Sequence, residues 1–64
     1  MVEKVWTPEE VAEHYRVELR TLEEWRRRGV GPEWFRAGRH PRYLESALIA
    51  WHKAQQKLAS AARA

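Results

Sequence analysis

The chain has 64 residues, 12 lysines and arginines, 9 acidic residues and no cysteine, which gives a net charge of +3. A chain of this length forms at most one small domain, and without cysteine it has neither a disulfide framework nor a cysteine-based zinc site. Its longest apolar run is far shorter than the roughly 20 residues that cross a bilayer, and glutamates near the N-terminus interrupt any signal-peptide core. We therefore expect a single domain over residues 1–64, in a reducing intracellular compartment.

The segment WTPEEV (6–11) predicts the start of a first helix. Thr7 can cap this helix, Pro8 suits its first position, and Glu10 completes a capping box with Thr7. Trp6 and Val11 occupy the two positions of a hydrophobic staple. We expect the helix to cover residues 8–15. Its predicted inner face carries Val11, Ala12 and Tyr15.

A second helix is predicted for residues 19–28, after a short interruption at residues 16–18. Gly29 follows as the residue that commonly ends a helix in the left-handed conformation. On a helical wheel, Leu22 and Trp25 lie on one side, whereas Arg20 and Arg27 lie on the opposite side. Two helices joined by about three residues form a helix-turn-helix.

A basic β-hairpin is predicted for residues 34–43, after the turn signal Gly31-Pro32, with its tip at residues 37–39. The stretch FRAGRHPRY (35–43) has an arginine at every third position and no acidic residue. Because arginine binds phosphates and base edges as a planar fork, this clustering favours a polyanionic partner over a merely solvated surface. Pro41 cannot donate a ladder hydrogen bond, which predicts that its strand is an edge strand or very short.

A third helix is predicted for about residues 46–62, with Ser46 as its cap. This helix is too long to be covered by two helices of two or three turns each. Ile49 falls on its polar side and has no obvious partner. The apolar stripe of this helix contains Leu48, Trp51, His52, Gln55, Leu58, Ala59 and Ala62.

The residues needed for common catalytic and metal sites are missing. The chain has no Asp, Asn or Cys, so neither a Ser-His-Asp nor a Cys-His triad can form. His14, His40 and His52 fall on three different predicted elements, and no two of them have the spacing of a metal-ligand pair. We expect no enzymatic activity, no cofactor and no metal.

The order of these elements resembles the excisionase family of small winged helix-turn-helix proteins, which are related to the DNA-binding domain of mercury-resistance-type regulators. The resemblance rests on WTPEEVAEHYRVELRTLEEWRRRG, GPEWFRAGRHPRY and SALIAW, and it covers about residues 5–55. It implies a mainly α-helical fold with a helix-turn-helix at about 7–28 and a β-hairpin wing at about 34–43. The chain departs from the family at Arg16, where the turn usually begins with glycine, and at Glu18, where serine or threonine usually caps the second helix. The residues that match the core of the family are Leu22, Trp25, Tyr43, Leu48 and Trp51.

In this family the second helix enters the major groove, and the wing reaches the adjacent minor groove or the DNA backbone. The corresponding positions on the second helix are Arg20, Thr21, Glu24, Arg27 and Arg28. Those on the wing are Arg36, Gly38, Arg39, His40 and Arg42. As an alternative, Glu23–Arg27 and Glu24–Arg28 have the spacing of ion pairs on a solvated face, and the hairpin charges protect an exposed edge. Trp34, beside the wing, is compatible with core packing or with base stacking.

The resemblance implies an excisionase that binds attachment-site DNA in several copies, bends or coats it, and directs an integrase toward excision. A small transcriptional regulator of phage or plasmid genes is the alternative, and an adaptor for an acidic protein is a more distant one. A free-standing module of 64 residues fits the excisionase slightly better. The expected partners are double-stranded DNA, an integrase and further copies of the chain, held weakly head to tail on DNA by apolar residues of the third helix. We expect no membrane association, and a location on DNA in the cytoplasm of a bacterium or phage-infected cell.

Overall fold

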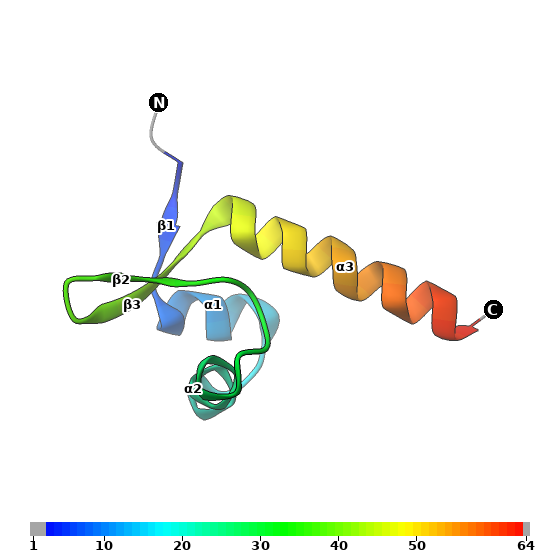
Figure 1. Cartoon of the computed structure of the whole chain (residues 1–64), viewed down its shortest axis with the longest axis horizontal. Coiled ribbons are helices and arrows are strands. Elements are labelled where there is room, and N and C mark those ends of the chain that lie inside the picture. The colour runs from blue at the N-terminus through cyan, green and yellow to red at the C-terminus, as the bar shows by residue number, and fades with distance from the viewer. Residues whose placement is uncertain (1–2, 64) are drawn as a thin grey trace.

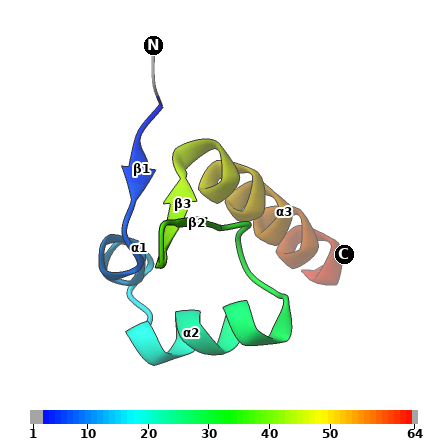
Figure 2. The same ribbon diagram turned by 60° about the vertical axis from the view of Figure 1, so that its left-hand side comes forward.

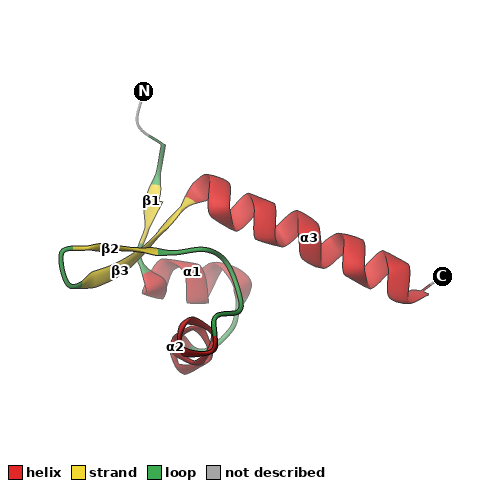
Figure 3. Cartoon of the chain, in the orientation of Figure 1, coloured by secondary structure: helices red, strands yellow, loops and turns green. Residues whose placement is uncertain are grey.

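The fold is mainly helical, with a small antiparallel sheet that connects the helices (Figures 1 and 3). The computed structural model describes residues 3–63 and the side chains of residues 3–61. The elements are β1 (Val5–Trp6), α1 (Pro8–Tyr15), α2 (Leu19–Arg28), β2 (Phe35–Ala37), β3 (His40–Leu44) and α3 (Glu45–Arg63). This arrangement confirms the predicted winged helix-turn-helix. No helix within residues 3–63 has the length and apolar character that a membrane crossing requires.

The capping box predicted at the start of α1 is present. The backbone N–H of Glu10 donates to the Thr7 hydroxyl (3.1 Å), and the backbone N–H of Thr7 donates to Oε1 of Glu10 (2.9 Å). The hydrogen bond from Thr7 stabilises the ionised carboxylate and lowers the pKa of Glu10. With Pro8 in its first turn, α1 covers the predicted residues 8–15 and buries Val11 and Ala12.

The turn between α1 and α2 is built without glycine. Arg16 has φ 55° and ψ 44°, the left-handed conformation in which an L-residue is disfavoured by about 1–2 kcal/mol. The bend is closed by a hydrogen bond from the N–H of Val17 to the carbonyl of Ala12 (3.0 Å). Glu18 then starts α2 without a side-chain capping bond, and Gly29 ends α2 in the left-handed region, as predicted.

The three strands form one sheet in the order β1-β3-β2, with antiparallel pairs throughout. β1 consists of two residues, Val5 and Trp6, which pair with Leu44 and Tyr43 at the end of β3. β1 has no signature in the sequence, because two residues are too few to show the alternation of a strand. β3 therefore connects the N-terminal segment, through β1, with the other strand of the wing, β2.

The prediction that Pro41 lies on an edge strand or a very short strand is wrong, since β3 has 5 residues and is the central strand. Ala37 and His40 flank a two-residue turn and form a hydrogen-bonded pair, so the next pair, Arg36 and Pro41, is a non-hydrogen-bonded one. The nitrogen of Pro41 consequently points away from β2. It points to the side of β3 on which β1 lies, but β1 does not reach Pro41, because β1 pairs only with the last two residues of β3. No ladder hydrogen bond is lost there.

The prediction of Ser46 as the N-cap of α3 is also wrong, since α3 begins at Glu45, directly after β3. Its first N–H groups are bonded by residues from the other end of the chain. The N–H of Glu45 donates to the carbonyl of Lys4 (3.1 Å), and the N–H of Ser46 donates to Oε1 of Glu3 (2.7 Å). The bonds from the backbone and the side chain of Ser46 lower the pKa of Glu3. The N-terminus of α3 is therefore capped by residues that are distant in the sequence.

The core lies where α1, α2, β3 and the first turns of α3 meet. Its buried side chains are Val11, Ala12, Leu22, Tyr43 and Leu48. The predicted core tryptophans, Trp25 and Trp51, are half-buried at its margin, with ring centroids 5.4 Å apart. Gly31 packs so closely on Trp25 that an added Cβ would lie 2.9 Å from Cε3 of that ring. The loop after α2 therefore requires glycine at this position.

The second half of α3 projects away from the rest of the molecule, at the end opposite the hairpin (Figures 1 and 2). All described side chains from Gln55 onward are exposed, and Leu58 is 64% exposed. This confirms that α3 is longer than the core can cover. Ala62, which belongs to the predicted apolar stripe, lies outside the residues whose side chains are described.

Candidate nucleic-acid interface

The outer face of α2 is the first part of the candidate interface. The side chains of Arg20, Arg27 and Arg28 are exposed, whereas those of Thr21 and Glu24 are half-buried. The amphipathic pattern explains this placement, because Leu22 on the opposite side is completely buried. α2 has 10 residues and is thus about 15 Å long, and the major groove of B-DNA, about 12 Å wide, admits such a helix.

One ion pair lies on this face. It joins Arg27 to Glu24, three residues earlier, and replaces the predicted pairs Glu23–Arg27 and Glu24–Arg28. It is the only ion pair among residues 3–61. Both of its side chains are accessible to solvent, where such a pair contributes about 0–1 kcal/mol. A phosphate can therefore displace Glu24 from Arg27 at little cost.

The wing is the second part. Gly38 and Arg39 form the two-residue turn between β2 and β3. Gly38 has φ 70° and Arg39 has no positive φ, which is the pattern of a type II′ turn with glycine at its first central position. The predicted tip is thus confirmed, and it presents the exposed side chains of Arg36, Arg39 and His40.

The two strands of the wing place their arginines on different faces. Arg36 pairs with Pro41, on the face that also carries the buried Tyr43, whereas Arg42 pairs with Phe35 on the other face. Arg42 is half-buried, and its guanidinium donates to the carbonyl of Pro41 (2.7 Å). The structure therefore brings Arg36, but not Arg42, to the side of the hairpin that faces α2. The regular spacing of the arginines did not reveal this difference.

α2 and the wing are joined by Arg26, which is not among the DNA-binding positions predicted from the sequence. Its Nη1 donates to the hydroxyl of Tyr43 (2.9 Å), which ties α2 to β3. Its guanidinium carbon also lies 5.8 Å from the ring centroid of Trp34, and that of Arg36 lies 5.3 Å from the same ring. Trp34 is half-buried and packs against the core cluster, which confirms core packing in the free protein. The approach of a helix arginine and a strand arginine to the same ring has no signal in the linear sequence.

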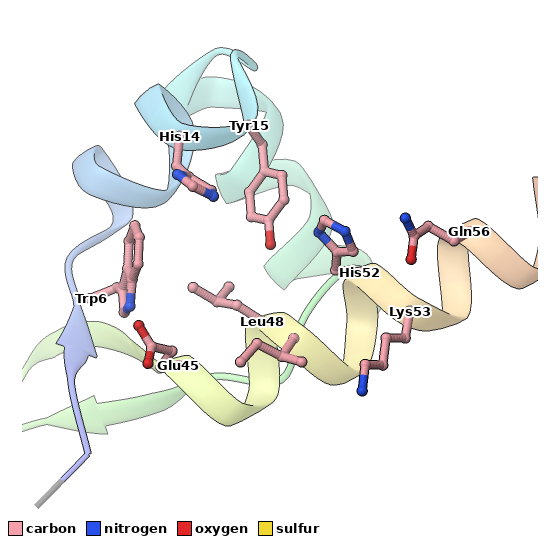
Figure 4. Close-up of a pocket in the computed structure, with 9 residues that line it drawn as sticks. Trp6, His14, Tyr15, Glu45, Leu48, His52, Lys53 and Gln56 are labelled. Atoms are coloured by element: carbon pink, nitrogen blue, oxygen red, sulfur yellow. The ribbon is translucent and has the colours of Figure 1, made fainter.

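A separate groove lies between α1 and the start of α3 (Figure 4). It is open, measures about 380 Å³ and is lined by Trp6, Tyr15, Leu48 and Ile49, with several polar residues. Burial raises the pKa of Tyr15. Ile49, for which no partner was predicted, thus forms part of a mostly apolar surface. None of the residues that line this groove belongs to α2 or to the wing.

The described residues include no cluster of three side chains that can hold a metal ion. Their arrangement is instead suited to a polyanion. Residues 19–43 contain seven arginines and three glutamates, and they form α2, the wing and the loop between them. Arg26 and Trp34 hold α2 and the wing together. The exposed arginines on these two elements are Arg20, Arg27, Arg28, Arg36 and Arg39.

Comparison with known proteins agrees with this geometry. The sequence model of a family described as a helix-turn-helix domain matches residues 7–56, from the cap of α1 into α3. None of the curated proteins and none of the solved structures matches the chain significantly.

Proposed function

The protein belongs to the helix-turn-helix domain family, a family of DNA-binding domains, and on this premise we propose that it is an excisionase. In this role it binds attachment-site DNA in several copies and directs an integrase toward excision. The observation that carries this proposal is the joined surface of α2 and the wing, in which Arg20, Arg36 and Arg39 are exposed. A helix and an adjacent basic hairpin can occupy neighbouring grooves of one duplex.

In the proposed complex, α2 lies in the major groove, and Arg20 and Arg27 contact guanine edges or phosphates. α2 contains no Asn or Gln, so it lacks the side chains that bind adenine in a bidentate manner. Arg39 at the wing tip enters the minor groove, where an arginine responds to groove width more than to base identity. The remaining proposed DNA-binding positions, to which we assign no specific contact, are Thr21, Glu24, Arg28, Gly38, His40 and Arg42.

We further propose that copies on adjacent sites contact one another head to tail. The projecting part of α3 ends in exposed apolar side chains such as Leu58, and the groove beside Ile49 offers a different apolar surface for it. A contact between two different surfaces does not close, so it continues along the duplex. The small area predicts a monomer in free solution and cooperative binding only on DNA with several sites.

The proposed activity requires binding alone and no catalytic step. An excisionase of this kind acts on DNA in the cytoplasm of a bacterium or phage-infected cell, together with an integrase that supplies the chemistry.

The experiment that tests the excisionase role is a recombination assay with the integrase encoded nearest to this gene. Footprinting on the DNA that flanks the gene first locates the binding sites. We expect several adjacent footprints beside the attachment site, and an increase in excision relative to integration when the protein is added. A variant with both Arg20→Ala and Arg39→Ala serves as the control that is deficient in DNA binding. Footprints confined to a promoter, with no effect on recombination, would support the transcriptional regulator instead.

Salt dependence separates DNA binding from an adaptor role. On duplex DNA, log affinity should fall with log salt with a slope of about −0.9 for each phosphate neutralised. A protein that acts only as an adaptor should show no such binding.

Deletion of residues 55–64 tests the contact between copies. The described side chains in this range are exposed, so we expect single-site affinity to change little while cooperativity on adjacent sites decreases. Independent filling of adjacent sites by the full-length protein would contradict the head-to-tail contact.

A further inference from the structure

The ring of Trp34 is close to two arginines that come from the two halves of the candidate interface. Arg26 is on α2 and Arg36 is on β2, and their guanidinium carbons lie 5.8 Å and 5.3 Å from the centroid of the Trp34 ring. Both distances are within the range in which a guanidinium is attracted to the electron-rich face of an indole. Trp34 itself is fixed, because it is half-buried and packs against the core cluster.

The two arginines are held to different degrees. Arg26 is half-buried, and its second attachment is the hydrogen bond to the hydroxyl of Tyr43, a residue that is only 1% exposed. Arg36 is exposed, and its guanidinium lies over the ring of Trp34. Arg26 is therefore the anchor of this arrangement, and Arg36 is the member that faces solvent.

Within residues 3–61, neither of these arginines forms an ion pair with a carboxylate. This matters for a polyanion partner, because a carboxylate would neutralise the charge and would have to be displaced on binding. An aromatic ring orients a guanidinium and leaves its full positive charge in place. Ordering a long side chain before binding also removes part of the entropy cost of the complex.

We propose that Trp34 is a positioning residue for DNA binding, which holds Arg36 of the wing beside α2 with its charge free for the DNA backbone. This role rests on the proposed function, in which α2 and the wing contact one duplex. It assigns the indole to the orientation of the wing arginine and not to base stacking. Because backbone contacts carry no base information, the effect is expected on all duplex sequences.

The test compares Trp34→Leu with the unmodified protein by fluorescence anisotropy on duplex DNA, over a series of salt concentrations. We expect Trp34→Leu to weaken binding by about 2- to 5-fold, the loss of one exposed cation–π contact, on specific and random duplexes alike. The salt slope should stay unchanged, because the number of charges is the same. Arg36→Ala, in contrast, should lower the slope by about one. Trp34→Phe retains an aromatic face and should recover most of the affinity.

Two controls isolate the contact between the ring and the arginine. Phe35→Leu removes a neighbouring aromatic side chain that the strand pairing places with Arg42, and it should leave affinity unchanged. The double variant Trp34→Leu with Arg36→Ala should bind no more weakly than Arg36→Ala alone. NMR of the free, unmodified protein should show side-chain protons of Arg36 shifted upfield by the ring current of Trp34, and Trp34→Leu should remove the shift.

The proposal is overturned if the protons of Arg36 show no ring-current shift in the unmodified protein, a result that does not depend on the folding of any variant. It is also overturned if a folded Trp34→Leu protein binds as tightly as the unmodified one, or if its defect persists in the Arg36→Ala background. Absence of any salt-dependent duplex binding by the unmodified protein would refute the proposed function itself. In that case a ring-current shift at Arg36 would still be measurable, so the two failures are distinguishable.

Discussion

Replacement of Trp25 by alanine tests the packing on which the orientation of α2 depends. The Trp25 ring lies so close to Gly31 that a Cβ at this position would clash with it. The ring centroid is 5.4 Å from that of Trp51, and the side chain packs against the core cluster. Truncation of a fully buried aromatic side chain costs about 3–5 kcal/mol, and we expect about 3 kcal/mol because Trp25 is half-buried. A domain of 64 residues has a total stability of about 3–10 kcal/mol, so this loss is a large fraction of the whole.

Thermal unfolding followed by far-UV circular dichroism measures this effect. For a domain of this size, a loss of about 3 kcal/mol lowers the midpoint temperature by about 12–24 °C. Leu58→Ala is the matched control, since Leu58 is 64% exposed and its truncation should change stability by less than about 0.5 kcal/mol. A Trp25→Ala protein that melts cooperatively near the unmodified midpoint would refute the packing of α2 against the loop and α3.

Three further predictions concern the interface and the termini of the helices. Arg39→Ala should weaken binding on most duplex sequences and lower the salt slope by about one, as measured by anisotropy titrations at several salt concentrations. Arg20→Ala should cost about 1–3 kcal/mol on the specific site and less on random DNA, and an equal loss on both would identify a phosphate contact. The lowered pKa of Glu3, caused by its bonds from Ser46, contributes stability that is present above the ordinary carboxyl pKa of 4.5 and is lost as the pH falls through the lower folded value. The unfolding free energy of Glu3→Gln should thus depend less on pH below about 4.5 than that of the unmodified protein, and identical pH profiles would show that Glu3 does not cap α3 in solution.

The sequence by itself determined the features that depend on a few neighbouring residues. The capping box of Thr7 and Glu10 gave the start of α1, and Gly29 gave the end of α2. The turn at Gly38 located the tip of the wing. In each case the decisive hydrogen bonds or dihedral angles involve residues at most four positions apart, so the local pattern was sufficient. The family resemblance located the turn at Arg16, and the structure shows that this residue adopts the left-handed conformation although it is not glycine.

Only the tertiary structure decided the features that join distant segments. The first turn of α3 is bonded by Glu3, 43 residues before Ser46, so no local pattern around Ser46 could reveal its cap. Strand register decided that Arg36 faces α2 and that Arg42 does not, because successive residues of a strand point to opposite faces.

The contacts that join α2 to the wing are also of this kind. Arg26 is 17 residues from Tyr43, and it shares the ring of Trp34 with an arginine from another element. Three adjacent arginines at residues 26–28 look alike in the sequence, and only the packing of α2 against β3 selects the first of them as an anchor. Composition and spacing therefore indicate that the chain binds a polyanion, whereas the arrangement of its arginines follows from long-range contacts that neither composition nor spacing encodes.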